Sequence, residues 1–425
     1  MPLSRRSAPD DQPNAVTLAR ARAEAAGIRL TDLSDSNPTH HGLFDPAIAD
    51  AVAHSAARAT HYDPDPRGPQ RAREALAARF GGSPSDYWLT AGTSQAYDWL
   101  FSLLADPGDA VAIPRPGYPL VDPLARLAGV GTVGYPAYYL HPHGWEYDAD
   151  ALAVTLGDPV VKMGDDPHTP ARRAARLPSI MAGSAAPCGT RVKAVVAVNP
   201  NNPTGAYADA ALADVCAARG VPLIADEVFA PFVLDAAPPS DNAAPACLVP
   251  HLADATDALT FTLDGVSKLL AAPQLKLGWI RISGPPDDVA RTAPVLDRIA
   301  DAYLPVSGPV ADALPALLDL ADAAVARVRD RLLANLATTR RYFADAPYRV
   351  RRCDGGWTVL VDVPRVLDDD ALAIALLRRG LSVHPGWFYD LDSLGTLALS
   401  LLPRPDAFAD GCRRLSDAID GLTRT

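Results

Sequence analysis

The chain has 425 residues, of which 48% are hydrophobic and 21% are charged, and this balance is ordinary for a globular protein that buries a large core. The 39 Lys and Arg residues against 50 Asp and Glu residues give a net charge of −11 without long blocks of like charge, which argues against a nucleic-acid partner. No run approaches the roughly 20 apolar residues that cross a bilayer, so no membrane partner is expected.

The amino-terminal region is predicted to hold a loose arm and a first helix. Residues 1–15 are polar and contain proline, whereas residues 15–26 have a helical pattern and lead to a short apolar run at 30–33. The two arginines near the start precede no apolar segment, so a secretory signal is not expected. Residues 68–80 include the string RAREALAARF, whose apolar spacing predicts an amphipathic helix.

Short apolar runs that end in turn residues alternate with helical segments through the middle of the chain. Strands of a parallel sheet are buried on both faces and therefore contain continuous apolar residues. The alternation predicts an α/β fold, with a mostly parallel sheet covered by helices on both faces. The expected strands are residues 86–90, 110–113, 193–198, 221–225 and 258–263.

Beyond Pro305 the pattern changes to long helices rich in Ala, Leu and Arg over residues 310–344. A hairpin at 349–363, a helix at 369–379, a strand near 397–401 and a final helix are expected to follow. This succession predicts a smaller α+β domain, completed in space by roughly the first forty residues.

We therefore expect three parts of the chain. Residues 1–50 form an arm and part of the small domain, residues 51–300 form the large domain, and residues 301–425 form the small carboxyl-terminal domain. Residues 157–190 have no clear period, and we interpret them as an insertion, either a long surface loop or a partly ordered segment.

The cysteines predict neither disulfides nor metal binding. They are five in number, lie far apart and include no Cys-x-x-Cys pair, so a disulfide framework or a zinc site is not expected. A reducing cytoplasm fits this usage best. The five are Cys188, Cys216, Cys247, Cys353 and Cys412.

Lys268 is the first candidate for chemistry, because it lies in the segment Asp264-Gly265-Val266-Ser267-Lys268, which directly follows the predicted strand at 258–263. A side chain at the carboxyl end of a buried strand points into the crevice where α/β proteins hold ligands. Burial and nearby cations lower the pKa of a lysine there, so that its amine can condense with an aldehyde. Taken alone, Lys268 is better explained as a surface lysine.

Two further polar residues follow predicted strands. Asp226 ends the strand at 221–225, where an ionised carboxylate can keep a pyridine nitrogen protonated. Asn202 lies in an Asn-Pro-Thr-Gly turn after the strand at 193–198, where its amide could reach a phenolic oxygen. The alternatives are a helix cap for Asp226 and an ordinary turn for Asn202.

A phosphate site is expected at the start of the helix that follows Gly92. Thr93 and Ser94 offer hydroxyls there, beside free N–H groups and the positive end of the helix dipole, although an ordinary helix cap would have the same sequence. Lys276, eight residues after Lys268, could reach the same anion. An amine, a carboxylate, an amide and a phosphate site are together what pyridoxal phosphate requires.

In this order the motifs resemble the fold-type I pyridoxal-phosphate family, specifically the class I/II aminotransferases, from about residue 30 to 402. The strings that carry the resemblance are Asp35-Ser36-Asn37-Pro38-Thr39, Tyr62-Asp63-Pro64 with Gly68, Thr90-Ala91-Gly92-Thr93-Ser94, Pro114-Arg115-Pro116-Gly117-Tyr118-Pro119, Asn199-Pro200-Asn201-Asn202-Pro203-Thr204-Gly205, Asp226-Glu227-Val228-Phe229, Ser267-Lys268 and Lys276-Leu277-Gly278-Trp279. The combination of NPNNPTG with the downstream Asp-Glu and Ser-Lys pairs is specific.

The resemblance implies a role for each of these residues toward bound pyridoxal phosphate. Lys268 is similar to the internal-aldimine lysine, Asp226 to the partner of the pyridinium nitrogen, and Asn202 to the ligand of the phenolic oxygen. The same comparison assigns Thr93, Ser94 and Lys276 to the phosphate and Tyr118 to stacking on the ring, although a loop aromatic such as Tyr118 often only fills the core.

Two more residues carry implications beyond the cofactor. Tyr62 resembles the tyrosine that reaches the phosphate of the partner subunit, which implies a homodimer with shared active sites. Asn37 falls where the amino-terminal loop of the family meets the substrate.

Three positions depart from the family. Phe229 replaces a tyrosine that often shares the phenolic oxygen, and Gly265 replaces a serine that often binds the phosphate. The carboxyl-terminal strand has Ala398 where the family usually has an arginine for the substrate α-carboxylate. Whether Arg115, Arg404 or another cation replaces that arginine is left open.

The leading hypothesis is transamination between an amino acid and a 2-oxo acid, with Lys268 as the general base. The missing arginine motivates an alternative, a pyridoxal-phosphate-dependent lyase or decarboxylase. A ligand-sensing domain without catalysis is the third interpretation, and it is disfavoured because the segment before Asn37 is short and has no basic excess.

Overall fold

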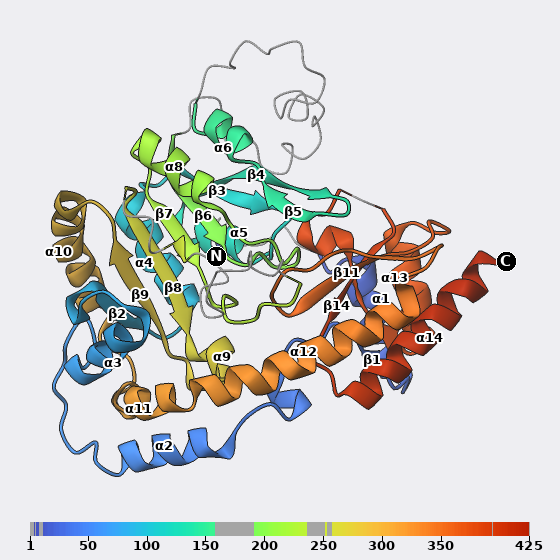
Figure 1. Cartoon of the computed structure of the whole chain (residues 1–425), viewed down its shortest axis with the longest axis horizontal. Helices are drawn as coiled ribbons and strands as arrows, with labels where there is room; N and C mark the ends of the chain where they lie inside the picture. The colour runs from blue at the N-terminus through green and yellow to red at the C-terminus, as the bar shows by residue number, and fades with distance from the viewer. Residues whose placement is uncertain are drawn as a thin grey trace, which may run out of the picture.

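The computed structural model describes residues 4, 6–7, 12–157, 191–235, 251–252, 257–392 and 394–424. Apart from residue 157, the insertion expected at 157–190 lies outside the described residues. The described parts form a large sheet flanked by helices and a smaller sheet with its own helices, seen side by side in Figure 1. No helix within the described ranges is long and apolar enough to cross a bilayer.

The large sheet has eight strands in the order β2-β9-β8-β7-β6-β3-β4-β5. The strands are β2 (Tyr87–Thr90), β3 (Ala110–Arg115), β4 (Gly131–Leu140), β5 (Gly144–Tyr147), β6 (Val192–Val198), β7 (Leu223–Asp226), β8 (Thr260–Gly265) and β9 (Gly278–Ser283). Neighbours from β4 through β3, β6 and β7 to β8 are parallel, whereas β9 is antiparallel to both β8 and β2, and β5 is antiparallel to β4. The predicted mostly parallel sheet is confirmed, and the antiparallel strands β5 and β9 were not predicted.

Helices cover both faces of this sheet, because each central strand is apolar on both sides. In β6, Ala194 and Val196 face one apolar cluster, and Val195 and Ala197 face the other. The first cluster is closed by α4 (Thr93–Leu104), α5 (Val121–Ala128) and α10 (Pro286–Tyr303). The second is closed by α6 (Ala149–Thr155) and α8 (Ala210–Arg219).

A third group of helices packs at the β2 and β9 edge of the large sheet. It consists of α2 (Pro46–Ala56), α3 (Gln70–Phe80), α9 (Val266–Leu269) and α11 (Gly308–Asp319). Their apolar side chains surround Tyr87, Leu89 and Trp279 from the two edge strands. Because α9 follows β8 directly, this packing fixes the segment that carries Lys268.

The smaller sheet has the order β10-β11-β14-β13, with all its neighbours antiparallel. Its strands are β10 (Arg349–Val350), β11 (Thr358–Asp362), β13 (His384–Pro385) and β14 (Thr396–Ser400). Three helices enclose its core with the sheet: α12 (Ala321–Phe343), α13 (Asp369–Leu377) and α14 (Pro405–Thr423). The long helix α12 runs from beside α9 toward the small sheet (Figure 1).

The amino-terminal segment joins this smaller part, as the sequence suggested. Strand β1 (Thr31–Asp32) pairs in parallel with β12 (Leu381–Ser382), and α1 (Ala15–Ala25) packs on α13. The Ser400 N–H also donates to the Leu33 carbonyl over 2.7 Å, which links the end of β14 to the same segment. The domain boundaries at 50 and 300 stay a prediction.

Candidate active site

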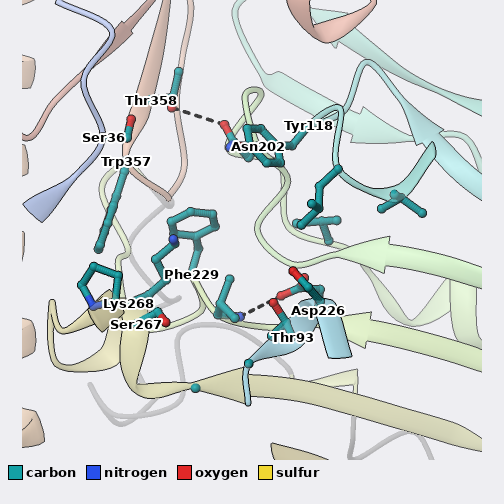
Figure 2. A pocket seen from close by; sticks show the side chains of 18 of the residues that line it. Ser36, Thr93, Tyr118, Asn202, Asp226, Phe229, Ser267, Lys268, Trp357 and Thr358 are labelled. Carbon is teal, nitrogen blue, oxygen red and sulfur yellow. Dashed lines mark hydrogen bonds between the residues drawn. The ribbon is translucent and has the colours of Figure 1, made fainter. Parts of the chain in front are cut away.

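A cavity of about 760 Å³ opens where the carboxyl ends of β6, β7 and β8 face the small sheet. Eight of the ten residues predicted for the site line it, and Figure 2 shows several of them turned toward the same space. The eight are Thr93, Ser94, Tyr118, Asn202, Asp226, Phe229, Lys268 and Lys276. Side chains that are distant in sequence are thus brought together.

Lys268 enters the cavity from α9, the short helix that begins immediately after β8. Its Nζ lies 5.5 Å from the ring centroid of Phe229 and 5.4 Å from that of Trp357, a distance at which aromatic faces attract a cation. Burial lowers the pKa of the Lys268 amine, nearby Asp226 opposes this, and the like charge of Lys276 adds to it. A neutral, nucleophilic amine is therefore more accessible here than on an exposed lysine.

Asp226 ends β7 and is held by two hydrogen bonds. The Tyr97 hydroxyl donates to Oδ2 over 3.0 Å, and the Val228 N–H donates to Oδ1 over 3.3 Å. Burial raises the pKa of Asp226 to about 6, and the hydrogen bond from Tyr97 acts in the opposite direction. The carboxylate is therefore ionised at neutral pH and can accept a hydrogen bond from a protonated ring nitrogen.

Tyr97 is a site residue that the sequence interpretation missed. It lies one turn after Thr93 on α4, so both side chains are on the same face of the helix and both line the cavity. This i, i+4 spacing was the available signal. Its partner Asp226 is 129 residues away in sequence, so the hydrogen bond itself could not be inferred.

The first turn of α4 faces the cavity and supplies donors for an anion. The residue before the helix, Gly92, has φ 119° and provides no side-chain cap, so the N–H groups of the first turn are not covered by it. Lys276 follows β8 and α9 and has the left-handed backbone φ 51°, ψ 57°. A non-glycine residue in this conformation is strained, which is common where a side chain must be aimed at a ligand.

A glycine is required at position 265 because a side chain would not fit there, and not because of a left-handed backbone conformation. A Cβ at this position would lie 2.8 Å from the Leu277 carbonyl oxygen and 3.0 Å from the Gly278 Cα. Gly278 is packed as closely, since its Cβ would lie 3.1 Å from the Gly92 Cα. Glycine rather than serine therefore stands at position 265 because the backbone segment that follows α9, itself packed against the residue that precedes α4, approaches too closely there for a side chain.

Asn202 lies in a loop that is fixed by its neighbours. Asn201 donates from Nδ2 to the Pro116 carbonyl over 2.9 Å and to Thr204 Oγ1 over 3.0 Å. Asn202 accepts a hydrogen bond at Oδ1 from Thr358 Oγ1 over 3.3 Å, which connects the large sheet to the small one (Figure 2). Its Nδ2 has no partner within the described part of the chain, so this donor is available to a ligand.

Two aromatic side chains border the cavity near Asn202 and Lys268. Tyr118 is 46% exposed, with its ring centroid 6.4 Å from that of Tyr389. Phe229 packs edge-on against Trp357, with centroids 5.4 Å apart. Trp357 was not predicted, and it replaces water with an apolar surface beside the Lys268 amine.

Two predicted residues do not line the cavity. Asn37 caps a short 3₁₀ helix, η1 (Pro38–His41), and its Oδ1 accepts from the N–H and the hydroxyl of Thr39. Its neighbours Ser36 and His40 line the cavity instead. Tyr62 is 74% exposed and lies between α2 and α3, outside the cavity of its own chain.

Neither arginine considered as a substitute at the carboxylate position reaches the cavity. Arg115 is buried and pairs with Asp122 over 2.8 Å and with Asp390 over 2.6 Å. Arg404 is exposed and precedes α14. Ala398 itself is buried in the centre of β14, opposite Leu360 on one side and His384 on the other.

These residues fit pyridoxal phosphate. The donors of the α4 first turn and Lys276 suit its phosphate, Asp226 suits its pyridine nitrogen, and the free Nδ2 of Asn202 suits its phenolic oxygen. The described residues contain no group of three or more side chains able to hold a metal ion.

Comparisons with known proteins agree with this geometry. The profile of the family described as aminotransferase class I and II matches residues 29–398. An alanine aminotransferase of Mycobacterium bovis is 27% identical over 312 residues, which are 70% of this chain and 62% of that protein. An arginine–pyruvate transaminase of Pseudomonas aeruginosa is 27% identical over 385 residues, 87% of this chain and 85% of that protein.

Solved structures share the fold over nearly the whole chain. An alanine aminotransferase from Pyrococcus furiosus superimposes with a TM-score of 0.78 at 19% identity, covering 99% of this chain and 100% of that one. At this identity the likeness concerns the fold alone, and it confirms the predicted fold-type I architecture. The chain spans about three fifths of the length of the alanine aminotransferase that it matches in sequence.

Proposed function

The chain belongs to the class I and II aminotransferase family, and on this premise we propose that it is a pyridoxal-phosphate-dependent aminotransferase that moves an amino group between an amino acid and a 2-oxo acid. The observation that carries the proposal is that one cavity is lined by both a buried lysine amine, whose pKa is lowered, and a buried carboxylate. Lys268 and Asp226 are the two groups concerned.

The residues that hold the cofactor are proposed from their positions on the cavity wall. Thr93, Ser94 and Lys276 bind the phosphate, as donors at a helix start beside a cation. Asn202 donates from Nδ2 to the phenolic oxygen, and Tyr118 covers the ring. Phe229 contributes apolar contact and no hydrogen bond.

Bound pyridoxal phosphate supplies a ring that accepts the electron pair left at the substrate Cα when a proton departs. Lys268 takes that proton on its Nζ and returns it, acting as general base and then as general acid. Asp226 keeps the proton on the pyridine nitrogen in place, oriented by Tyr97. Trp357 and Phe229 exclude water from the space around the amine.

We also propose a homodimer with shared active sites. Tyr62 is the residue concerned, since it is 74% exposed and does not line the cavity of its own chain. In a dimer it donates to the cofactor phosphate of the partner subunit. Mixing Lys268→Ala chains with Tyr62→Ala chains tests this, because one site of each hybrid dimer regains both residues and activity returns. Equal inactivity before and after mixing contradicts it.

The proposed transamination is tested by transfer of isotope. The enzyme is loaded with pyridoxal phosphate and incubated with a ¹⁵N-labelled amino acid and an unlabelled 2-oxo acid, over a panel of donors and acceptors. The expected result is ¹⁵N in the new amino acid and a 2-oxo acid derived from the donor. Absence of both with every pair contradicts the proposal.

A lyase or decarboxylase is the second candidate, and the buried Ala398 favours it, because no arginine of β14 holds the substrate carboxylate. A lyase of this kind eliminates the β-substituent of a cysteine-type amino acid and releases ammonia with a 2-oxo acid, whereas a decarboxylase releases carbon dioxide with an amine, in both cases from the donor alone. Release that does not depend on an added acceptor supports this second candidate. The cytoplasmic location expected from the sequence stays a prediction.

A further inference from the structure

A guanidinium from the amino-terminal helix lines the cavity. Arg20 lies on α1, and it reaches over the pairing of β1 with β12. Its Nη2 pairs with Asp32 Oδ2 over 2.8 Å, its Nη1 donates to Ser382 Oγ over 3.2 Å, and its Nε donates to Glu24 over 3.1 Å. The side chain is 43% exposed, so it remains open to the cavity.

This guanidinium contacts the segment that leads to the strand paired with Ala398, since it donates to Ser382, two residues before His384. Ala398 is the register partner of His384, and both charges of the Arg20–Asp32 pair act on that histidine. Burial lowers the pKa of His384, so the histidine itself is neutral at pH 7. Within the described residues, the arginine that lines the cavity on the side of His384 therefore comes from α1 and not from β14.

Arg20 can bind an anion without losing its existing partners. A guanidinium has five N–H donors, and three of them make the contacts described above. Asp32 holds the group in place: it accepts from the N–H and the hydroxyl of Ser34 over 2.9 and 2.6 Å. These bonds and Arg20 lower the pKa of Asp32 against the effect of burial, so it stays ionised.

The lysines of the described cavity wall, and the exposed His40, have partners or roles already. Lys268 and Lys276 belong to the cofactor end of the cavity, and His40 pairs with Asp35 over 2.8 Å. Arg115 and Arg404 do not line the cavity. Arg20 is thus the arginine that the described cavity wall offers to a second anion.

We propose that Arg20 binds the α-carboxylate of the amino substrate, in place of the arginine that the family usually carries at the position of Ala398. The proposal rests on the transamination proposed above. It makes α1 part of the substrate site and makes Asp32 a positioning residue that orients the guanidinium. The substrate class that follows is α-amino acids rather than simple amines, despite the alanine in β14.

The first test compares an amino acid with its own α-carboxamide. The twenty standard L-amino acids are screened for conversion of the bound cofactor, and the fastest donor is then measured beside its carboxamide in wild type and Arg20→Ala. Only the acid loses a charged hydrogen-bonded pair in Arg20→Ala. The KM of the acid should therefore rise about 10- to 100-fold, while the KM of the carboxamide should change little. A merely structural role of Arg20 weakens both compounds equally and overturns the proposal.

Two further variants sharpen this test. Arg22→Ala changes an exposed arginine two positions along the same helix, and it should leave the preference for the acid unchanged. Arg20→Lys keeps one charge without the fork of donors, and it should recover part of the preference. Loss of preference in Arg22→Ala, or none in Arg20→Ala, contradicts the assignment.

A binding measurement separates this proposal from the proposed function. Calorimetric titration of the cofactor-loaded protein with the same donor made unreactive, as its α-methyl analogue, reports carboxylate binding without turnover. We expect about 10- to 100-fold weaker binding in Arg20→Ala. If pyridoxal phosphate fails to bind Lys268 at all, the proposed function fails. If it binds and the variants keep wild-type affinity, only the Arg20 assignment fails.

Discussion

The Tyr97 hydroxyl donates a hydrogen bond to Asp226 Oδ2 over 3.0 Å, and both side chains are buried. The bond connects the first turns of α4 with the carboxyl end of β7, which are the two elements that hold opposite ends of the expected cofactor. Burial raises the pKa of Asp226 and this bond lowers it, so Tyr97 helps to keep the carboxylate ionised. The relationship leads to the first prediction.

Replacing Tyr97 by phenylalanine should raise the pKa of Asp226 further and weaken the cofactor site. A hydrogen bond to a charged group contributes about 1.5–3 kcal/mol, so we expect roughly tenfold or greater loss in pyridoxal phosphate affinity at pH 7. Equilibrium titration of the cofactor measures it. Tyr135→Phe is the matched control, since that hydroxyl donates to the Val196 carbonyl outside the cavity. Equal effects of the two variants would contradict a specific role for Tyr97.

Asp226 should also make the cofactor-free protein less stable as pH rises. Its folded pKa is about 6 against an ordinary 3.8, so the folded chain binds this proton more tightly than the unfolded chain. The contribution of Asp226 to the free energy of unfolding is fully present below about pH 4, falls as pH rises from about 4 to about 6, and levels off above that, with a total loss of about 3 kcal/mol.

The Asp226→Asn variant lacks this titration and tests it. Between pH 5.0 and 7.5 the stability of wild type relative to the variant should fall by about 1 kcal/mol in urea unfolding. Asp50→Asn, at an exposed position on α2, is the control and should track wild type. Parallel curves for wild type and Asp226→Asn would show that this carboxyl does not titrate in that range.

Restoring the usual serine at Gly265 should harm the fold rather than improve phosphate binding. The new Cβ meets the Leu277 carbonyl oxygen at 2.8 Å, so the backbone of β8 or its neighbour must move. Overpacking of this kind costs about 1–3 kcal/mol, which thermal unfolding would detect. Gly421→Ser is the control, because that helical glycine has no atom within 4 Å of its added Cβ. A Gly265→Ser protein as stable as wild type, with tighter phosphate binding, would refute the explanation.

Lys276→Met should separate phosphate recognition from ring recognition. Affinity for pyridoxal phosphate should fall about 10- to 100-fold, whereas affinity for pyridoxal, which has no phosphate, should change little. The pKa of Lys268 should rise, because a like charge that lowers it is removed. Lys193→Met, outside the cavity, serves as the control. Equal losses for both compounds would assign Lys276 a structural role.

The sequence predicted the parts of the site that local pattern determines. A polar residue at the end of an apolar run marks the carboxyl end of a buried strand, and neighbouring parallel strands bring such ends together. Asp226 and Lys268 were proposed on this basis, and both line one cavity because β7 and β8 are adjacent and parallel. The small sheet was also predicted, since a change of residue pattern marks it.

The remaining parts depend on contacts between distant segments. The pairing of Tyr97 with Asp226 and the approach of Arg20 to the cavity leave no local pattern in the sequence. The direction of β9 was equally hidden, because a short apolar segment after Lys276 has the same composition whether it runs parallel or antiparallel. The hairpin of β4 and β5 was missed because tyrosine, proline and glycine interrupt its alternation.

The most direct test of the whole account is the visible absorption spectrum of the purified protein with pyridoxal phosphate, recorded for wild type and Lys268→Ala before and after adding amino acids. We expect the visible band of lysine-bound cofactor in wild type alone, and its conversion to the pyridoxamine spectrum with particular amino acids. A band of equal strength in Lys268→Ala, or no band in either protein, would contradict the assignment of Lys268 and with it the proposed function.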